Sequence, residues 1–434
     1  MSNFHVEFDW QKPHGVQGPE LRATWANLKL TVDGEIVTTL ADRVSCIVRD
    51  SITLPLYPLA EWIATHWWAL QYELMVPGRA AQDTYDERHC LFNAREGYAI
   101  PALRVVPLGE SVYLECNPLE MPANNLRFVK GGSTRLPLSE FRDEVTRFLN
   151  AVIARLHERG VQNTLLADEW DAIQQVDEDE RQFCIASAEL GLDPYDLDSE
   201  QRDAILKTAA DLPPSLLDDF LNIADPASLS NQSHRLRRGL DDLASLQCRL
   251  TGLIALRRTL TDGVNGRPWD QGYRAAQTLR QIVGANGHIF ESIDDIGKVL
   301  QIDSSELPRA IIESSELDFV DGLLAVGKNG SPGFIVTKRN EHSKRYHFCR
   351  ALFEWLNSRT DDPVIVSPAR SERQQRNRAF AAEFLAPAKL VQQELSSRSV
   401  GDDEISDIAD RFHVSDHVIR HQIENHHLAR VISG

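Results

Sequence analysis

The sequence lacks closely spaced cysteines. Its six cysteines are scattered over 434 residues, and none forms a CxxC pair. A disulfide framework and a zinc ribbon both require thiols at short, regular spacings, so neither is expected here. We therefore expect free thiols in a reducing compartment. The cysteines are Cys46, Cys90, Cys116, Cys184, Cys248 and Cys349.

Long apolar runs are also missing. No stretch approaches the roughly 18 apolar residues that a membrane-spanning helix needs. The opening segment MSNFHVEFDWQKPHG has neither the basic start nor the apolar run of a signal peptide. These features predict a cytoplasmic protein that does not enter a membrane.

Several catalytic and phosphate-binding motifs are absent from the sequence. It contains no GxxxxGK[ST] loop, no GxGxxG following a strand and no GxSxG, so phosphate cradling and serine hydrolysis have no support. It also contains no HExxH, the zinc-binding helix motif of many metallopeptidases. His157 and Glu158 come nearest, but Val161 stands where the second histidine would be.

Basic residues are in the minority. The chain has 46 Lys and Arg against 64 Asp and Glu, which gives a formal net charge of −18. Such a surface repels a phosphate backbone, so nucleic-acid binding would need a local basic patch. The hydrophobic content of 42% is ordinary for a globular protein. At this length we expect two or three domains.

The hydrophobic patterns predict an α+β, multi-domain protein. Residues 1–135 are predicted to form an α/β module, with a hairpin around Asp33-Gly34, a helix over 56–74 and strands near 102–107 and 112–116. The role of this module is not assigned.

Residues 136–262 are predicted to be a helical region. An apolar stripe runs along 141–156, and a second long helix is expected over 240–260. The segment TDGVNGRP at 261–268 has two glycines and a proline and is the preferred domain boundary.

Residues 263–434 are predicted to form a third domain. Short strands alternate with helices, and a helix-turn-helix-like pair forms the tail. The predicted strands lie at 318–326 and 333–337, and the helices at 269–283, 344–356, 373–384, 404–412 and 416–425.

This third domain resembles the ImmA/IrrE family of zinc metallopeptidases over most of its length. The segment KRYHFC at 344–349 is similar to the entry of the family's active-site helix. FAAEFLAP at 380–387 resembles the family's later helix and is the most specific match, and 405–428 is similar to its C-terminal helical tail. The resemblance implies a zincin-like fold.

In that family, HExxH supplies two zinc ligands and a general base, and a later helix supplies a third ligand. In register, Arg350 stands at the first histidine, Ala351 at the glutamate and Glu354 at the second histidine, while Glu383 stands at the third ligand. Arginine has no lone pair to donate to a metal, and alanine cannot act as a base. The resemblance therefore implies a degenerate site with no catalytic residues and no zinc.

The charged residues of the degenerate site can be arranged in more than one way. Arg350, Glu354 and Glu383 are predicted to form an ion-pair network where the metal would be, because a buried Glu383 needs a partner. The plainer alternative is a surface pair between Arg350 and Glu354, four residues apart on one helix. A displaced zinc site built from His347, Glu354 and Glu383 is a weaker alternative.

The resemblance implies a regulatory or sensor protein that acts through protein–protein interaction. Family members cleave helix-turn-helix repressors, so the expected partner is such a regulator, or a toxin–antitoxin or phage-defence component. The alternatives are an active endopeptidase with a non-standard metal site and a DNA-binding transcriptional regulator. The oligomeric state is not assigned.

Acidic residues outnumber basic ones in the C-terminal tail, so direct nucleic-acid binding is not expected. His413, His417 and His421 recur there at four-residue spacing. A solvated, partly protonated face is the plainer interpretation of this stripe, and a metal-binding stripe is the alternative.

Overall fold

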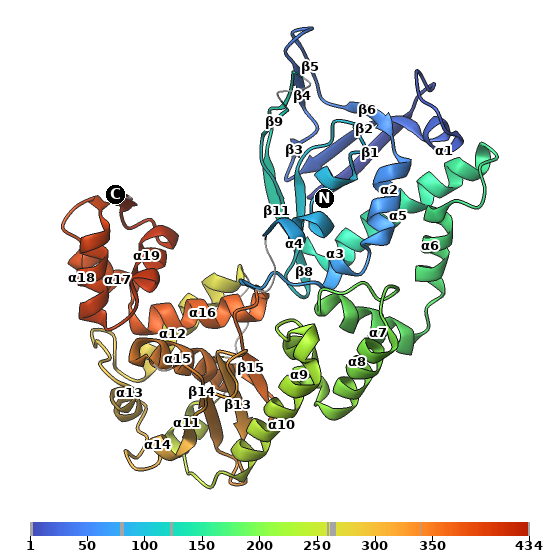
Figure 1. Cartoon of the computed structure of the whole chain (residues 1–434). Coiled ribbons are helices and arrows are strands. Elements are labelled where there is room, and N and C mark those ends of the chain that lie inside the picture. Colours follow the sequence, from blue (N-terminus) through green and yellow to red (C-terminus); the bar gives the residue numbers. More distant parts are fainter. Residues whose placement is uncertain are drawn as a thin grey trace. The chain divides into compact units, whose positions relative to one another are not determined.

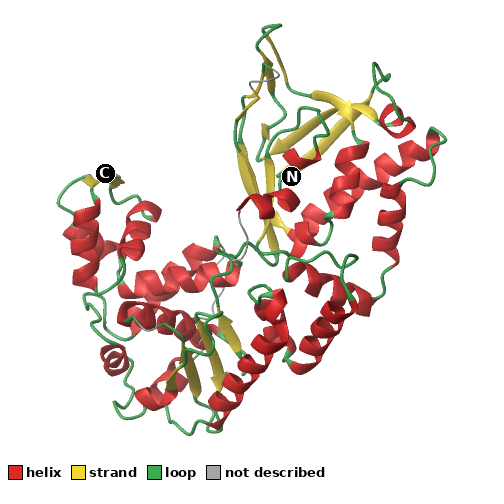
Figure 2. Ribbon diagram, in the orientation of Figure 1, coloured by secondary structure: helices red, strands yellow, loops and turns green. Residues whose placement is uncertain are grey.

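The chain forms two compact units, Met1–Ser199 and Glu200–Gly434, and each is a mixture of helices and strands (Figures 1 and 2). The computed structural model describes residues 3–78, 82–121, 125–257, 260, 266–338 and 340–432. Among these residues, no helix combines the length and the apolar character needed to cross a bilayer. The expected α+β, multi-domain class is confirmed.

The first unit begins with a four-stranded antiparallel sheet. Its central strand, β2, pairs with β1, β3 and β6. Asp33 and Gly34 have φ values of 51° and 79°, the two positive values that a type I′ hairpin turn requires. The predicted hairpin is therefore confirmed. The strands are β1 (Phe4–Trp10), β2 (Trp25–Val32), β3 (Glu35–Ile36) and β6 (Ile52–Pro55).

Two further antiparallel sheets complete the strands described in this unit. One has the order β5-β4-β10-β9 and the other the order β11-β8-β7. The predicted strands near 102–107 and 112–116 are β7 and β8. The bounds are β4 (Leu40–Asp42), β5 (Ile47–Arg49), β7 (Leu103–Pro107), β8 (Ser111–Cys116), β9 (Leu119–Met121), β10 (Leu126–Phe128) and β11 (Gly132–Pro137).

Helix α5 (Leu138–Glu158) packs against β1, β8 and β11, and the apolar stripe predicted over 141–156 is buried on that side. The helix predicted over 56–74 is instead two helices, α2 (Tyr57–Thr65) and α3 (Ala69–Tyr72), separated by a turn. The other helices here are α1 (Pro19–Ala23), α4 (Gln82–His89), the 3-10 helix η1 (Leu91–Ala94), α6 (Leu165–Gln175) and α7 (Glu178–Glu189).

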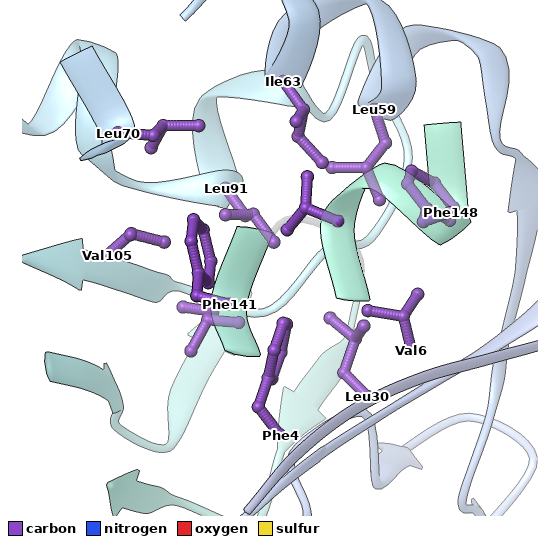
Figure 3. A pocket seen from close by; sticks show the side chains of 12 residues that line it. Phe4, Val6, Leu30, Leu59, Ile63, Leu70, Leu91, Val105, Phe141 and Phe148 are labelled. Atoms are coloured by element: carbon purple, nitrogen blue, oxygen red, sulfur yellow. The ribbon is translucent and has the colours of Figure 1, made fainter. Parts of the chain in front are cut away.

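A small cavity of about 20 Å³ lies within the core of this unit (Figure 3). Phe4, Phe141 and Phe148 are among its lining side chains, and all of the lining residues are apolar. The volume is close to that of a single water molecule, which needs two to four polar partners to stay bound. Because no polar group lines the cavity, a water molecule would have no hydrogen-bond partner there, and the cavity is not expected to bind one.

The second unit is built on a sheet with the order β12-β14-β13-β15. Strand β12 runs parallel to β14, while β13 is antiparallel to both β14 and β15. Helix α15 packs on Phe334 of β14 through Phe348, and α10 approaches the adjacent Gly333. Because successive strand residues face opposite sides, the two helices cover opposite faces of the sheet. The strands are β12 (Ile311–Glu313), β13 (Gly322–Val326), β14 (Pro332–Val336) and β15 (Val364–Val366).

Helices surround this sheet, and α16 packs against both α12 and α15. The helices predicted over 269–283, 344–356 and 373–384 are α12, α15 and α16, and the predicted tail pair is α18 and α19. Bounds in chain order are α8 (Ser199–Asp211), α9 (Pro214–Leu221), η3 (Pro226–Ser228), α10 (Leu229–Ser245), α11 (Thr251–Leu256), α12 (Pro268–Ile282), α13 (Ile293–Val299), α14 (Leu307–Ala310), α15 (Glu341–Asn357), α16 (Glu372–Leu385), α17 (Ala388–Glu394), α18 (Asp402–Phe412) and α19 (Asp416–Asn425). A short parallel pair, β16 (Ser399–Val400) and β17 (Arg430–Val431), closes the tail.

The predicted helical region 136–262 is shared between the two units. Helices α5 to α7 belong to the first unit, and α9 to α11 belong to the second. The helix predicted over 240–260 is interrupted after Ser245, because Leu250 turns inward and its amide donates to Ser331 Oγ over 3.1 Å. Residues 258, 259 and 261–265, which include most of the predicted boundary, lie outside the described residues.

Two buried arginines join separate chain segments of the second unit. Arg345 donates to the carbonyls of Glu291 and His413, and Arg280 donates to those of Phe384 and His288. Burial lowers the pKa of both guanidinium groups, that of Arg280 to about 10. Each guanidinium holds two chain segments together through backbone acceptors.

The first unit contains a buried acid that is surrounded by donors. Glu73 accepts from Arg88 Nε at 2.8 Å, and His89 Nε2 lies 3.1 Å from its carboxylate. Tyr85 stacks on His89 with ring centroids 3.8 Å apart. Burial raises the pKa of Glu73, but the hydrogen bonds and charges of Arg88 and His89 outweigh burial and lower it to about 2.

This cluster predicts a specific acid sensitivity. A carboxyl whose folded-state pKa is about 2, against an ordinary 4.5, stabilises the fold above pH 4.5, and this contribution is lost as the pH falls toward 2. We expect Glu73→Gln to cost about 3 kcal/mol at neutral pH and much less near pH 2. Urea unfolding of the full chain at several pH values measures this difference.

Glu87→Gln is the matched control, because Glu87 lies on the same helix α4 and is exposed. It should unfold like the natural chain at every pH. A stability difference between Glu73→Gln and the natural chain that is independent of pH would contradict the prediction.

Candidate functional site

The second half of the helix that carries the predicted site is buried on every side. The Asn340 side chain caps the start of α15 by accepting from the amides of His342 and Ser343. From Phe348 to Leu356 every residue of α15 is buried, including the two charged residues Arg350 and Glu354. A charge in such a place requires partners, because its burial without them costs several kcal/mol.

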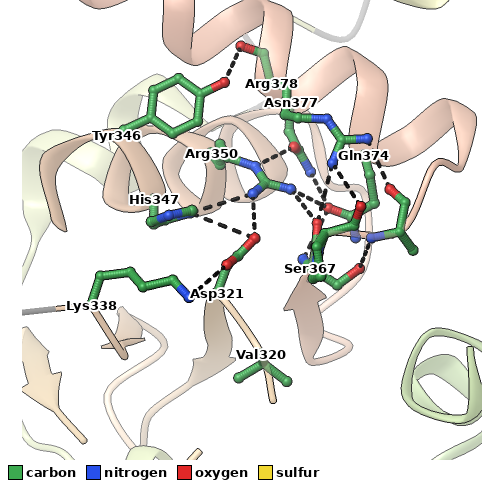
Figure 4. Close-up of polar contacts among 12 residues, drawn as sticks. Val320, Asp321, Lys338, Tyr346, His347, Arg350, Ser367, Gln374, Asn377 and Arg378 are labelled. Atoms are coloured by element: carbon green, nitrogen blue, oxygen red, sulfur yellow. Dashed lines mark hydrogen bonds and ion pairs between the residues drawn. The ribbon is translucent and has the colours of Figure 1, made fainter. Parts of the chain in front are cut away.

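Arg350 has an acceptor for each of its five N–H groups (Figure 4). Nε donates to Asn377 Oδ1 at 2.8 Å, and Nη1 donates to Asp321 Oδ2 at 2.8 Å and faces His347 Nδ1 at 3.3 Å. Nη2 donates to the Ser367 carbonyl at 2.6 Å and to Gln374 Oε1 at 2.8 Å. The side chain is 2% exposed, so these bonds replace water almost completely.

The strands bring the acceptors of Arg350 into position. Asp321 immediately precedes β13 and Ser367 immediately follows β15, and these strands are antiparallel neighbours. The Asp321 amide donates to the Val366 carbonyl at 2.9 Å, which holds the two residues at the same edge of the sheet. Asp321 and Ser367 therefore face α15 together.

Two amides of α16 supply the remaining acceptors. Gln374 and Asn377 are three residues apart, on one helix face, and both are fully buried. Asn377 Nδ2 donates to Glu354 Oε1 at 2.8 Å and to Gln374 Oε1 at 3.1 Å. Asn377 thus stands between Arg350 and Glu354 and connects them.

Glu354 and Arg373 form the other end of this network. Glu354 Oε2 lies 3.6 Å from Arg373 Nη1, and Arg373 also donates to Asp219. Burial lowers the pKa of Arg373, but the carboxylates of Asp219 and Glu354 outweigh burial and raise it above its usual value. Lys338 Nζ lies 3.4 Å from Asp321 Oδ1. The three cations and three carboxylates of the network, Arg350, Arg373, Lys338, Asp219, Asp321 and Glu354, balance in charge.

The protonation states agree with this geometry. Burial alone raises the pKa of Asp321, but the neighbouring His347, Arg350 and Lys338 outweigh it and lower the pKa below the ordinary value. Burial lowers the pKa of His347 to about 4, so its ring is neutral at pH 7. Because Arg350 can only donate, His347 accepts at Nδ1 and carries its proton at Nε2.

Glu383 belongs to a second buried cluster. Its carboxylate accepts from Gln277 Nε2 at 2.9 Å, the Ala388 amide at 3.1 Å and Gln422 Nε2 at 2.8 Å. His426 Nε2 lies 3.7 Å away. Glu383 therefore joins α16 to α12, to the start of α17 and to α19.

The predicted network of Arg350, Glu354 and Glu383 is wrong in its membership. The anion bound to Arg350 is Asp321, and Glu354 is reached through Asn377, while the hydrogen bonds of Glu383 are made in the second cluster. The alternative of an Arg350–Glu354 surface pair is wrong as well, because both side chains are buried. Ala351 is buried and apolar and contributes no polar group.

The displaced zinc site is not assembled by these contacts. His347 faces Arg350 and Asp321, Glu354 faces Asn377 and Arg373, and Glu383 faces α12 and α19. Among the described residues, no group of three or more His, Cys, Asp or Glu side chains has a geometry suited to a metal ion.

Sequence reasoning missed Asp321, Gln374 and Asn377. The available signal was the pair of amides at Gln374 and Asn377, three residues apart in a helix that also carries a long apolar run. Buried amides at that spacing can serve a charge on a neighbouring helix. Nothing local marked Asp321, because it reaches the site through strand pairing.

Comparisons with known proteins found no relative. No protein-family model matches the chain, and neither does any curated protein or solved structure. The resemblance to the ImmA/IrrE family thus stands on the segments at 344–349, 380–387 and 405–428.

Replacement of Arg350 tests the network. In Arg350→Met, Asp321 loses its closest buried cation and three amide or carbonyl acceptors each lose one hydrogen bond, so we expect a loss of about 3–5 kcal/mol. Urea unfolding of the full chain measures it. Adding Asp321→Asn should restore part of the loss, because the orphaned charge is then removed.

Arg238→Met is the control for this variant. Arg238 pairs with Glu316 at 3.4 Å, but both side chains are about two-thirds exposed, at 66% and 67%. Such a pair contributes about 1 kcal/mol or less. An equally small effect of Arg350→Met would show that the buried network does not stabilise the unit.

Replacement of Glu383 tests its role as an anchor. Glu383→Ala removes one hydrogen bond from each of Gln277, Gln422 and the Ala388 amide, at a cost of about 1–3 kcal/mol. We expect faster amide hydrogen exchange in α17, α18 and α19, with β13 and β14 unchanged. Asp407→Ala, an exposed change on α18, is the control. Exchange that rises equally in all elements would contradict the local anchoring.

Proposed function

We propose that this protein is a catalytically inactive member of the ImmA/IrrE-like class that acts by binding another protein. The observation that carries the proposal is the saturation of Arg350, whose five N–H groups all have acceptors within the protein. The resemblance puts this residue at the first zinc ligand of the family.

The chemistry of the position supports the proposal. A guanidinium is charged at any physiological pH and cannot ligate a metal, and it repels a second cation placed beside it. The neighbouring carboxylates are engaged, since Asp321 pairs with Arg350 and Lys338 and Glu354 accepts from Asn377. Ala351 offers no general base where the family has a glutamate.

The class of partner follows from the resemblance alone. Intact members of the family act on helix-turn-helix repressors, so we propose that this chain binds a regulator of that kind without cutting it. A regulatory or sensor role, in a toxin–antitoxin or phage-defence setting, is consistent with such binding.

The electrostatics of the tail favour a protein partner over DNA. In the helix-turn-helix-like pair, Arg411 is paired with Glu394 and Arg420 with Asp402. Both arginines are thus neutralised by carboxylates. Phosphate binding at this face would have to break these pairs against a net charge of −18.

A binding and cleavage assay tests the proposal. The full chain is mixed with purified helix-turn-helix regulators encoded beside its gene, with one equivalent of zinc or with a chelator. We expect a complex on size-exclusion chromatography and an intact regulator on denaturing gels in both conditions.

Two results would overturn the proposal. Zinc-dependent cleavage that the chelator stops, and that Glu354→Ala abolishes, would identify an active endopeptidase with a non-standard site. A specific, salt-dependent shift of operator DNA with no protein complex would identify a DNA-binding regulator.

A further inference from the structure

One face of α19 carries two histidines in direct contact. Val418, Ile419 and Ile423 are buried and fix the inner side of the helix, while His417 and His421 are exposed on the outer side. Their spacing of four residues puts them one turn apart. The ring nitrogens His417 Nε2 and His421 Nε2 are 3.0 Å apart.

This separation matches the bite of a chelate. With metal–nitrogen bonds of about 2.0–2.1 Å, two nitrogens 3.0 Å apart subtend roughly 95° at a shared metal. That angle is close to the cis angle of square-planar and octahedral complexes and smaller than the tetrahedral angle. Imidazole ligands in tetragonal geometry are preferred by Cu²⁺ and Ni²⁺.

A carboxylate stands behind one of the two rings. Glu424 Oε2 lies 3.9 Å from His421 Nδ1, on the side away from His417. Histidine ligands commonly direct their second nitrogen toward a carboxylate, directly or through water, and this keeps the proton on that nitrogen. In that tautomer His421 Nε2 carries a lone pair that is available to a metal.

The hydrogen bond between the two rings occupies the place that the cation would take. The cation replaces the proton shared by the two Nε2 atoms, and the donating ring moves that proton to its Nδ1. No net proton is released in this exchange.

The supporting helix is held firmly. Gln422, the residue after His421, donates to Glu383 and to the Ala386 carbonyl.

We propose that His417 and His421 form an exposed two-histidine site on α19 that binds a divalent transition-metal cation, with Cu²⁺ and Ni²⁺ preferred. The site lies apart from the buried network around Arg350 and is independent of the proposed pseudo-peptidase function. Its remaining coordination positions are filled by water.

Metal titration of the full chain tests the proposal. The protein is prepared without a histidine tag, stripped with a chelator and titrated with Cu²⁺ in a non-coordinating buffer by calorimetry. We expect one site per chain, weakened at least tenfold in His417→Ala and in His421→Ala. Electron paramagnetic resonance of the one-to-one complex should show two equatorial nitrogen ligands.

His157→Ala is the matched control, because His157 is exposed on helix α5 and has no histidine one turn away. It should bind Cu²⁺ as the natural chain does. All three substitutions are exposed, and circular dichroism checks that each variant is folded. Unchanged binding in the His417→Ala/His421→Ala double variant, or no binding by the natural chain, would overturn the site.

Discussion

The guanidinium of Arg350 is a positive charge that has been removed from water, and its free energy depends on keeping all five hydrogen bonds at once. The acceptors come from α15 itself, from the chain before β13, from the chain after β15 and from α16. A displacement of any of these elements lengthens or breaks one of the five hydrogen bonds. The position of Arg350 therefore constrains how the central helix, the neighbouring helix and the sheet of the second unit are assembled.

The same physical pattern recurs elsewhere in that unit. Arg280 and Arg345 each bind two backbone carbonyls from separate chain segments, and Glu383 binds donors from three helices. Apolar packing brings the helices together, and Gly272 of α12 shows how closely, since a Cβ there would lie 2.3 Å from the Arg376 carbonyl. The buried polar groups then fix register and orientation, which non-directional apolar contacts leave open.

Local patterns predicted the elements well, and the site less well. The Asp33-Gly34 turn and the helices over 344–356 and 373–384 could be read from turn chemistry and apolar spacing. The anion paired with Arg350 could not, because Asp321 reaches it through the pairing of β13 with β15. Glu383 was predicted as its partner because the resemblance puts it at the third-ligand position and a buried carboxylate needs a cation. The uncharged Gln374 and Asn377 that face Arg350 carried no such signal.

The set of acceptors around position 350 also has a consequence for how this sequence can change over evolutionary time. A histidine there would offer one N–H group to acceptors that now receive five, and it would leave Asp321 with only the half-exposed Lys338 as a cation. A change of Arg350 to a metal-ligating residue thus passes through unstable intermediates unless Asp321, Gln374 and Asn377 are replaced as well. Once such a set of neighbours has formed, each member makes substitution of the others more costly, so the set is kept or lost as a whole.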